Sequence, residues 1–168
     1  DLIHWTHSKI VLKTDYAEHF ADAYWVWAPQ TIYDNHAKKY MIYFTLQRTG
    51  DGRKSLITYY AYANADFTGF ESEPRQLFSA KYGSIDNDII YHRGTYHLFY
   101  KGNTKNAEGK EIKNGIQQAT SKSLMGPWKE DFKYIDAYAD TKTAVEGSGV
   151  FKLNDRNEYV MMYDVYGS

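Results

Sequence analysis

Residues 86–100 read DNDIIYHRGTYHLFY, a short apolar strand, a tight turn and a second strand rich in aromatic residues. The same pattern occurs at residues 28–44 and again at residues 146–163. The three copies begin 58 and 60 positions apart, at Ala28, Asp86 and Glu146. A repeat of this length, built from short strands, is typical of a β-propeller or a related array.

Each repeat extends beyond this hairpin. A third strand is predicted at residues 56–63 and at residues 115–121. A polar turn follows and ends in a bulky aromatic residue, Phe70 in one copy and Trp128 in the other, again 58 positions apart. Residues 1–5 match the same closing segment. The pattern predicts an all-β chain of four-stranded blades: the end of one blade, two complete blades and the first half of another.

The predicted limits of these four units are residues 1–15, 16–75, 76–135 and 136–168. An array of this extent leaves raw sheet edges and an unclosed ring, which propellers avoid. We therefore expect further residues on both sides of this chain. No stretch has a clear period of 3.6 residues, so few helices are expected.

The composition excludes several classes of protein. Aromatic residues make up 17% of the chain, with 17 tyrosines, which suits strands. The net charge is −1 with both signs interspersed, so no nucleic-acid partner is expected. No apolar run approaches the length of about 18 residues that a membrane span needs. The chain has no cysteine, which excludes disulfides and thiolate metal sites.

Asp86 and Glu146 align in the repeat, so they are predicted to share one structural position in neighbouring blades. The first strand of a blade lines the central channel, and its beginning faces one mouth. Like charges held close do not ionise together at low cost, so one pKa of the pair is expected to rise. Cleavage of a glycosidic bond needs such a protonated acid beside an ionised partner. The alternative is that both acids only cap strand starts or bind backbone amides.

Asp88 lies two residues after Asp86 and is expected on the same face of the strand. It is a candidate to support the acid pair or to accept a substrate hydroxyl. We prefer Asp86 because Asp86, and not Asp88, aligns with Glu146. Asp34, at a strand end, is expected to lie in solvent, as are Asp66 and Asp164.

Three segments together carry a resemblance to a known family. They are Trp27-Ala28-Pro29, Ser84-Ile85-Asp86, and Glu146-Gly147 followed by Val150-Phe151-Lys152. In this order and spacing, and with residues 1–5 similar to the usual end of a first blade, they resemble glycoside hydrolase family 43 over essentially the whole chain. The resemblance implies a five-bladed propeller that hydrolyses arabinose-, xylose- or galactose-containing glycans with inversion. It also numbers the four units as the end of blade 1, blades 2 and 3, and the first half of blade 4.

The resemblance further implies the catalytic roles. The family uses an Asp base in blade one, an Asp in blade three that modulates the pKa of the acid, and a Glu acid in blade four. By position, Glu146 matches the general acid and Asp86 matches the pKa modulator. The base falls upstream of Asp1 and outside this chain. Asn87 and Ser148 stand where proline is common in the family, which leaves the subfamily open.

Aromatic and polar residues near the first strands are candidate substrate contacts. Trp27 matches the family's tryptophan at this point, and Trp25 lies two residues before it. An indole face suits the C–H-rich face of a sugar, whereas packing between blades is the alternative use of these rings. Gln30 aligns with Asp88 and Ser148 and is expected to face the channel. Three further aromatic residues repeat in register and are expected to pack in the core or between blades: Tyr40, Tyr96 and Tyr159.

No cofactor or metal site is predicted within this segment. The six histidines show no metal-binding spacing, and no glycine-rich phosphate loop follows a strand. By the family resemblance, a Ca²⁺ ion in the channel is compatible with the complete propeller through a His of the last blade. The predicted partner is an oligosaccharide or polysaccharide of plant type. The substrate class favours a secreted or periplasmic location, and the oligomeric state is left open.

The sequence leaves three alternative functions to consider. A propeller acting on fructosides is disfavoured, because its Arg-Asp-Pro and Glu-Cys-Pro signatures are not matched at Asp86 or Glu146. A non-catalytic carbohydrate-binding propeller would keep the fold and lack the base. A protein-interaction scaffold is disfavoured by paired acids in the channel.

Overall fold

The computed structural model describes residues 3–50, 56–102, 108, 110, 115–131 and 144–166 of the chain. Two helices of four residues each, α1 (Leu12–Asp15) and α2 (Ala17–Phe20), come first. Every later element of the described part is a strand. In the described residues no helix is long and apolar enough to cross a membrane.

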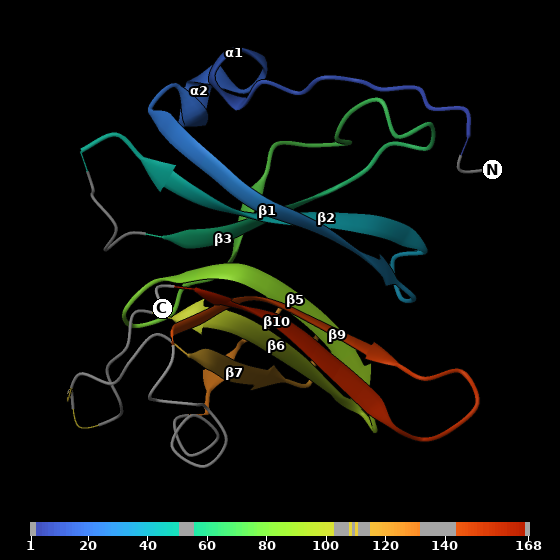
Figure 1. Ribbon diagram of the computed structural model, residues 1–168. Coiled ribbons are helices and arrows are strands. Elements are labelled where there is room, and N and C mark those ends of the chain that lie inside the picture. The colour runs from blue at the N-terminus through green and yellow to red at the C-terminus, as the bar shows by residue number, and fades with distance from the viewer. Residues whose placement is uncertain are drawn as a thin grey trace.

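The strands form three antiparallel sheets in sequence order (Figure 1). The first sheet contains β1 (Ala23–Asp34), β2 (Lys39–Arg48), β3 (Ile57–Tyr62) and β4 (Arg75–Phe78). The second contains β5 (Ser84–His92), β6 (Thr95–Gly102), β7 (Ile116–Ser121) and β8 (Lys129–Glu130). The third contains β9 (Ala144–Lys152) and β10 (Tyr159–Tyr166). The two four-stranded meanders and the final hairpin follow one another in the predicted order, although β4 runs past the predicted limit at residue 75.

The sheets pack face to face through apolar side chains. Between the first and second sheets lies a buried cluster that includes Met41, Tyr43, Leu98 and Tyr100, each at most 1% exposed. A smaller cluster of Phe99, Ile116 and Val145 joins the second sheet to β9. Side chains alternate between the two faces of a strand, so the second sheet can present apolar residues to the sheets on both sides of it.

A polar network also ties the three sheets together. The carboxylate of Asp88 accepts a hydrogen bond from the Val150 N–H at 2.5 Å and one from the Tyr43 hydroxyl at 3.5 Å. The Tyr43 hydroxyl accepts the Ile89 N–H at 3.0 Å. Burial, followed by the charge of Asp88, raises the pKa of Tyr43, so this hydroxyl stays protonated. Asp88 therefore serves as a link between β2, β5 and β9.

Each first strand contains an irregular step in its pairing. The step lies between Trp27 and Gln30 in β1, between Ile85 and Asp88 in β5, and between Glu146 and Gly149 in β9. In each step one residue has a left-handed backbone: Ala28 (φ 46°), Asp86 (φ 55°) and Gly147 (φ 65°). These three residues therefore occupy the equivalent position in the three sheets.

This register corrects the predicted alignment of the acids. Asp86 is equivalent to Gly147, and Glu146 lies one position earlier, equivalent to Ile85 and Trp27. Gln30 and Asp88 are likewise equivalent to Gly149 and not to Ser148. The physical reason is backbone conformation, because glycine adopts a left-handed φ without steric cost. Asn87 and Ser148 then share the position of Pro29.

Asp34 is buried at 6% exposure, which contradicts its predicted place in solvent. Its Oδ1 accepts the N–H groups of His36 at 2.8 Å and Ala37 at 3.1 Å, and its Oδ2 accepts the Tyr62 hydroxyl at 2.6 Å. Burial opposes ionisation of this carboxyl, but these three donors outweigh it and lower its pKa. The side chain fixes the turn between β1 and β2 and anchors it to β3.

Asp34→Ala is expected to lower the free energy of unfolding of the full-length protein by about 1–3 kcal/mol, because three donors lose their acceptor. The folded pKa is lower than the ordinary value of 3.8, so the contribution of Asp34 is present above that value. It is lost as the pH falls through the folded pKa. Urea unfolding at pH 7 and near pH 3 measures both effects, with the exposed Asp155→Ala as the control. Equal losses at both pH values would contradict this assignment.

The repeated tyrosines differ in their environments. Tyr96 is half-buried and packs against the main core cluster, and half-buried Tyr159 bonds to His92 at 2.9 Å. Tyr40 is 47% exposed, so it does not lie in the core, one of the two places predicted for it. Its ring lies at the outer turn of the first sheet, against Tyr33 and Phe67, with ring centroids 5.0 and 5.3 Å away.

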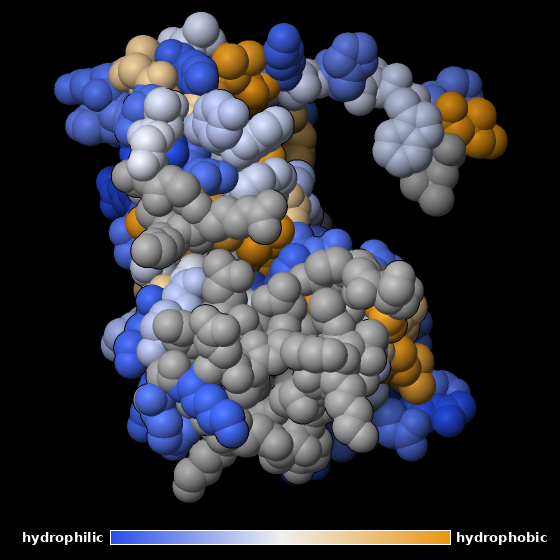
Figure 2. All heavy atoms as spheres, turned by 60° about the vertical axis from the view of Figure 1, so that its left-hand side comes forward, coloured by the Kyte–Doolittle hydropathy of each residue, from blue (hydrophilic) through white to orange (hydrophobic). Residues whose placement is uncertain are grey.

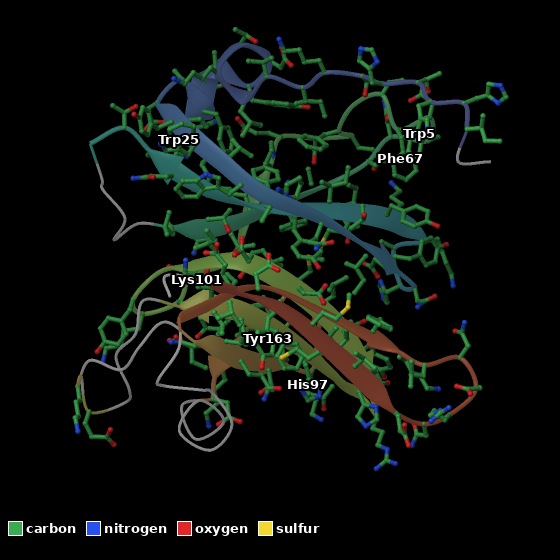
Figure 3. All side chains as sticks on the ribbon, viewed as in Figure 1. Trp5, Trp25, Phe67, His97, Lys101 and Tyr163 are labelled. Atoms are coloured by element: carbon green, nitrogen blue, oxygen red, sulfur yellow. The ribbon has the colours of Figure 1, made fainter. Side chains whose placement is uncertain are left out.

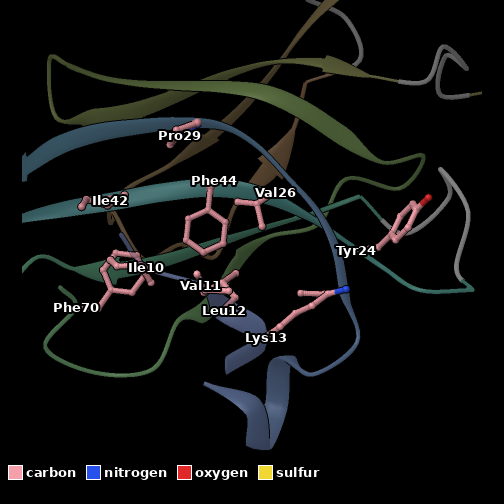
Figure 4. A pocket seen from close by; sticks show the side chains of 11 residues that line it. Ile10, Val11, Leu12, Lys13, Tyr24, Val26, Pro29, Ile42, Phe44 and Phe70 are labelled. Atoms are coloured by element: carbon pink, nitrogen blue, oxygen red, sulfur yellow. The ribbon is translucent and has the colours of Figure 1, made fainter. Parts of the chain in front are cut away.

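The helices cover the other face of the first sheet. Leu12 and Phe20 pack on Ala23, Phe44 and Leu46. An apolar cavity of about 340 Å³ remains between residues 10–13 and the β1–β2 hairpin (Figure 4). The extended segment before α1 stands away from the sheets (Figure 2) and carries Ile3 and Trp5, which are 79% and 76% exposed.

Candidate active site

The beginnings of β5 and β9 bring Asp86 and Glu146 together. β5 and β9 lie parallel, since the N–H of Gly147 donates to Oδ2 of Asp86 at 3.1 Å and that of Val150 donates to Asp88. The backbone next to Glu146 is thus held directly by the Asp86 carboxylate. Glu146 and Asp86 lie side by side although they do not occupy equivalent positions of the repeat.

Lys101 completes the contact between the two strands. Its Nζ lies 2.5 Å from Oε2 of Glu146, and its side chain is 16% exposed against 36% for the glutamate. Lys101 is the pairing partner of Ile85, the residue before Asp86. An ammonium group in this place fixes the orientation of the Glu146 side chain from the β6 side.

The electrostatics of the site are centred on Asp86. Burial raises the pKa of the Asp86 carboxyl above its ordinary value. After burial, the effects on this pKa decrease in the order Gly147, Glu146, Lys101 and Asp164. The Gly147 N–H and the Lys101 ammonium lower the pKa, whereas the charges of Glu146 and Asp164 raise it. Burial and two neighbouring carboxylates together outweigh one ammonium and one amide. The site therefore holds a carboxyl group that keeps its proton to higher pH than a solvated aspartate.

Asp164 is the third carboxylate at this end of the sheets. It pairs with Glu146 across the β9–β10 hairpin and is exposed. A Cβ atom added to Gly147 would lie 3.3 Å from Oδ2 of Asp164. Gly147 suits this position for two reasons: it adopts the left-handed backbone without steric cost, and it leaves room for the Asp164 carboxylate, which an added Cβ would displace slightly.

Three of the other four predicted site residues lie on β1. The rings of Trp25 and Trp27 stack with centroids 6.1 Å apart and an interplanar angle of 10°. Trp25 is 49% exposed, Trp27 is half-buried and Gln30 is exposed. Trp25 and Lys101 both lie toward the left-hand end of the ribbons in Figure 3. In the described part of the chain, no hydrogen bond joins Trp25, Trp27 or Gln30 to Asp86 or Glu146.

Asp88 lies outside this acid group. Its carboxylate is taken by Val150 and Tyr43, and burial raises its pKa while these donors lower it. Of the six predicted residues, Asp86 contacts the backbone next to Glu146, and Trp25 stacks on Trp27. Half-buried Asp88 belongs to the hydrogen-bond network between the sheets, and Gln30 is exposed.

Lys101 and Asp164 were missed by the sequence analysis. Each is the first residue after a repeated aromatic segment. Lys101 pairs with Ile85 and Asp164 pairs with Glu146, in each case the residue just before the irregular step, a β-bulge, of the first strand. Thr45 has the same place in the first sheet. That repeated position was the available signal, because a charged residue opposite the bulge must lie beside the acid pair. Within the described residues, no group of three His, Asp or Glu side chains is arranged to hold a metal ion.

The arrangement is suited to proton transfer. When two carboxyl groups lie on neighbouring strands and one has a raised pKa, the pair can carry a single proton, as acid–base catalysis requires. The backbone amide and the ammonium fix the positions of both side chains, so little reorientation is required when a substrate binds.

Comparisons with known proteins place this geometry in context. A family model described as a probable glycosyl hydrolase domain, related to glycoside hydrolase family 43, matches residues 1–168. No curated protein matches the chain significantly.

Several solved structures share the fold. An endo-arabinase from Bacteroides thetaiotaomicron VPI-5482 has 17% identity and a TM-score of 0.60, with 82% of this chain and 50% of that chain covered. An endo-1,4-beta-xylanase from the same organism has 21% identity and a TM-score of 0.61, with 85% and 50% covered. An alpha-L-arabinofuranosidase from Lactobacillus brevis has 11% identity and a TM-score of 0.60, with 84% and 45% covered.

The chain spans about half the length of these solved structures. At these identities the likeness concerns the fold, which is part of a five-bladed β-propeller, as predicted. The sequence signal is carried by the family model, which covers every residue. This chain belongs to the family of probable glycosyl hydrolase domains related to glycoside hydrolase family 43.

Proposed function

We propose that the full-length protein is an inverting glycoside hydrolase that cleaves arabinose-, xylose- or galactose-type bonds in plant-type polysaccharides or oligosaccharides. Family membership supports the reaction class. The similarity to proteins described as an endo-arabinase, an endo-xylanase and an arabinofuranosidase supports the sugar class. The observation that carries the proposal is the contact of Asp86 with the backbone beside Glu146, with Lys101 on the glutamate.

In this proposal Glu146 is the general acid. It donates its proton to the departing glycosidic oxygen as the bond to the anomeric carbon breaks. A water molecule, deprotonated by an Asp base outside these residues, forms the new bond from the opposite face, which inverts the anomeric centre. Room for that water requires acid and base carboxyls roughly 6.5–9.5 Å apart.

Asp86 is proposed to position and modulate the acid. Its carboxylate holds the Gly147 amide, and this fixes the backbone from which the Glu146 side chain extends. Its own pKa is raised by burial and, to a smaller extent, by the charge of Glu146. Lys101 restrains the Glu146 carboxylate from the other side.

The stacked Trp25 and Trp27 are proposed to contact the sugar. The exposed Trp25 offers an apolar face toward the same end of the ribbons as Lys101, which contacts Glu146 (Figure 3). Gln30 is proposed as a polar contact within the channel. In these roles the ring faces and the amide group bind the substrate and take no part in the proton transfer.

A panel of aryl glycosides tests the proposal directly. The full-length protein is assayed on aryl α-L-arabinofuranoside, β-D-xylopyranoside and β-D-galactopyranoside, with the anomer of the first-formed sugar observed by NMR. We expect hydrolysis of at least one substrate with inverted product. Binding of the matching oligosaccharides without any hydrolysis would favour a non-catalytic carbohydrate-binding propeller instead.

A further inference from the structure

A second cavity, of about 770 Å³, opens at the far ends of the first strands. It is lined by the last residues of β1, β5 and β9, including Tyr33, Tyr91 and Phe151. Tyr91 lies five residues after Asp86, and Phe151 lies five residues after Glu146. At about 3.3 Å per strand residue, roughly 17 Å of strand separates these two rings from the acid pair, and roughly 10 Å separates the nearer lining residue Ile89 from Asp86. It is therefore a different place on the molecule from the candidate active site.

The walls of this cavity present aromatic faces. Tyr91, Phe151 and Tyr33 are 56%, 44% and 41% exposed. Tyr91 packs against Tyr96 with ring centroids 4.8 Å apart, and the Tyr159 hydroxyl is fixed by His92 at 2.9 Å. Exposed rings that are held by neighbouring rings offer contact area at low entropic cost. Flat apolar faces with hydroxyl groups at their edges are suited to sugar rings.

The charged residues of the cavity are all basic. Lys122 and Lys152 line it together with the imidazole ring of His36, and no Asp or Glu is among the described residues that line it. Lys122 is held in place by Gly94 O at 3.3 Å and Thr95 Oγ1 at 2.8 Å. Lys152 is exposed and forms no ion pair with a carboxylate in the described part of the chain. These cations favour a ligand that carries negative charge.

Three acidic residues adjoin lining residues of the cavity, and each already has partners: Asp34 in the β1–β2 turn, Asp88 on Val150 and Tyr43, and Glu158 with Arg156 at 3.7 Å. Asp34 is buried, and after burial of the ring its charge contributes to raising the pKa of Tyr96. Its oxygens are occupied by Tyr62 and by the amides of the β1–β2 turn. The side that faces a ligand thus combines aromatic rings with two lysines.

We propose that this cavity is a second saccharide site that binds acidic oligosaccharides, those bearing a uronic acid carboxylate. Tyr91 and Phe151 contact the sugar rings, and Lys152 and Lys122 bind the carboxylate. The choice of a saccharide, and not another anion, rests on the proposed function. The site would hold an acidic branch or chain of the polysaccharide while the acid pair acts elsewhere.

Binding is measured by calorimetry on the full-length protein in a Glu146→Gln background, which separates binding from turnover. The probes are a glucuronic-acid-substituted xylo-oligosaccharide and the same oligosaccharide without the acid. We expect the acidic probe to bind more tightly, and added salt to reduce this difference. Tyr91→Ala should weaken binding of the acidic probe about tenfold, and Lys152→Met should remove the preference for the acid. Trp5→Ala and Lys129→Met, exposed residues away from the cavity, are the matched controls.

Equal binding of both probes, or unchanged binding in Tyr91→Ala and Lys152→Met, would overturn the inference. In the protein with Glu146 intact, both variants should retain kcat/KM on small aryl glycosides, because they lie away from the acids. Loss of that activity would place the two residues in the active site and refute a separate site. Acidic probe binding in a protein that hydrolyses no glycoside would refute the proposed function and leave this site standing.

Discussion

Glu146→Gln in the full-length protein is expected to lower kcat on natural oligosaccharides by about 10²–10⁴-fold, the usual contribution of general acid catalysis. Glutamine preserves the volume of the side chain and can still contact Lys101, but it has no proton to donate to the leaving oxygen. The substitution removes one carboxylate beside Asp86, so the fold should be retained. Steady-state kinetics on an arabino- or xylo-oligosaccharide gives kcat and KM separately.

The leaving group provides the internal check on this prediction. An aryl glycoside with an acidic phenol departs without protonation, so Glu146→Gln should affect its hydrolysis far less than that of the natural substrate. Glu158→Gln is the matched control, since Glu158 is 65% exposed and pairs only weakly with Arg156 at 3.7 Å. If both substrates slowed equally, Glu146 would be contributing something other than a proton.

The strand pattern could be predicted because it depends on local signals. The apolar and aromatic alternation of residues 86–100 specifies two strands and their turn, and its repetition specifies successive sheets. β3 and β7 were found by the same argument. β4 and β8, of four and two residues, have too few residues to show a period.

Asp86 and Glu146 lie close together, as predicted, but they do not occupy equivalent positions of the repeat. Counting residues between Asp86 and Glu146 cannot reveal that the bulge of β9 is centred on Gly147. Backbone conformation decides this, because Asp86 and Ala28 accept a left-handed φ at some cost whereas glycine accepts it freely. An acid one residue before the bulge still reaches the partner strand.

Burial of single polar residues was the least predictable feature. Asp34 follows a strand and precedes a turn, a position that is usually solvated, yet Tyr62 from β3 covers it. Lys101 follows an aromatic strand and looks like a strand end, yet it contacts Glu146 of the next sheet. Both outcomes depend on residues distant in sequence, which a single repeat unit does not display.

Asp86→Asn is expected to lower kcat/KM on natural oligosaccharides by about 10²-fold while raising stability at neutral pH. Asparagine tolerates the left-handed backbone (φ 55°), and its carbonyl oxygen can accept the Gly147 N–H. The change thus removes the charge and the proton of Asp86 and keeps its geometry. Without that charge the acid at Glu146 loses its modulating partner, so the effect should appear mainly in kcat and in the pH profile.

The effect of Asp86→Asn on stability has a sign that follows from the raised pKa of Asp86. An acid that is harder to ionise in the folded state binds its proton more tightly there than in the unfolded chain. Stability therefore falls as the pH rises from the ordinary value of 3.8 through the raised folded value. Asp86→Asn removes this loss, so its advantage in urea unfolding should be present at pH 7 and fade below about pH 4. A variant that is both inactive and less stable at pH 7 would show that the carboxylate of Asp86 holds the two sheets together, and would end its assignment as a modulator of the acid.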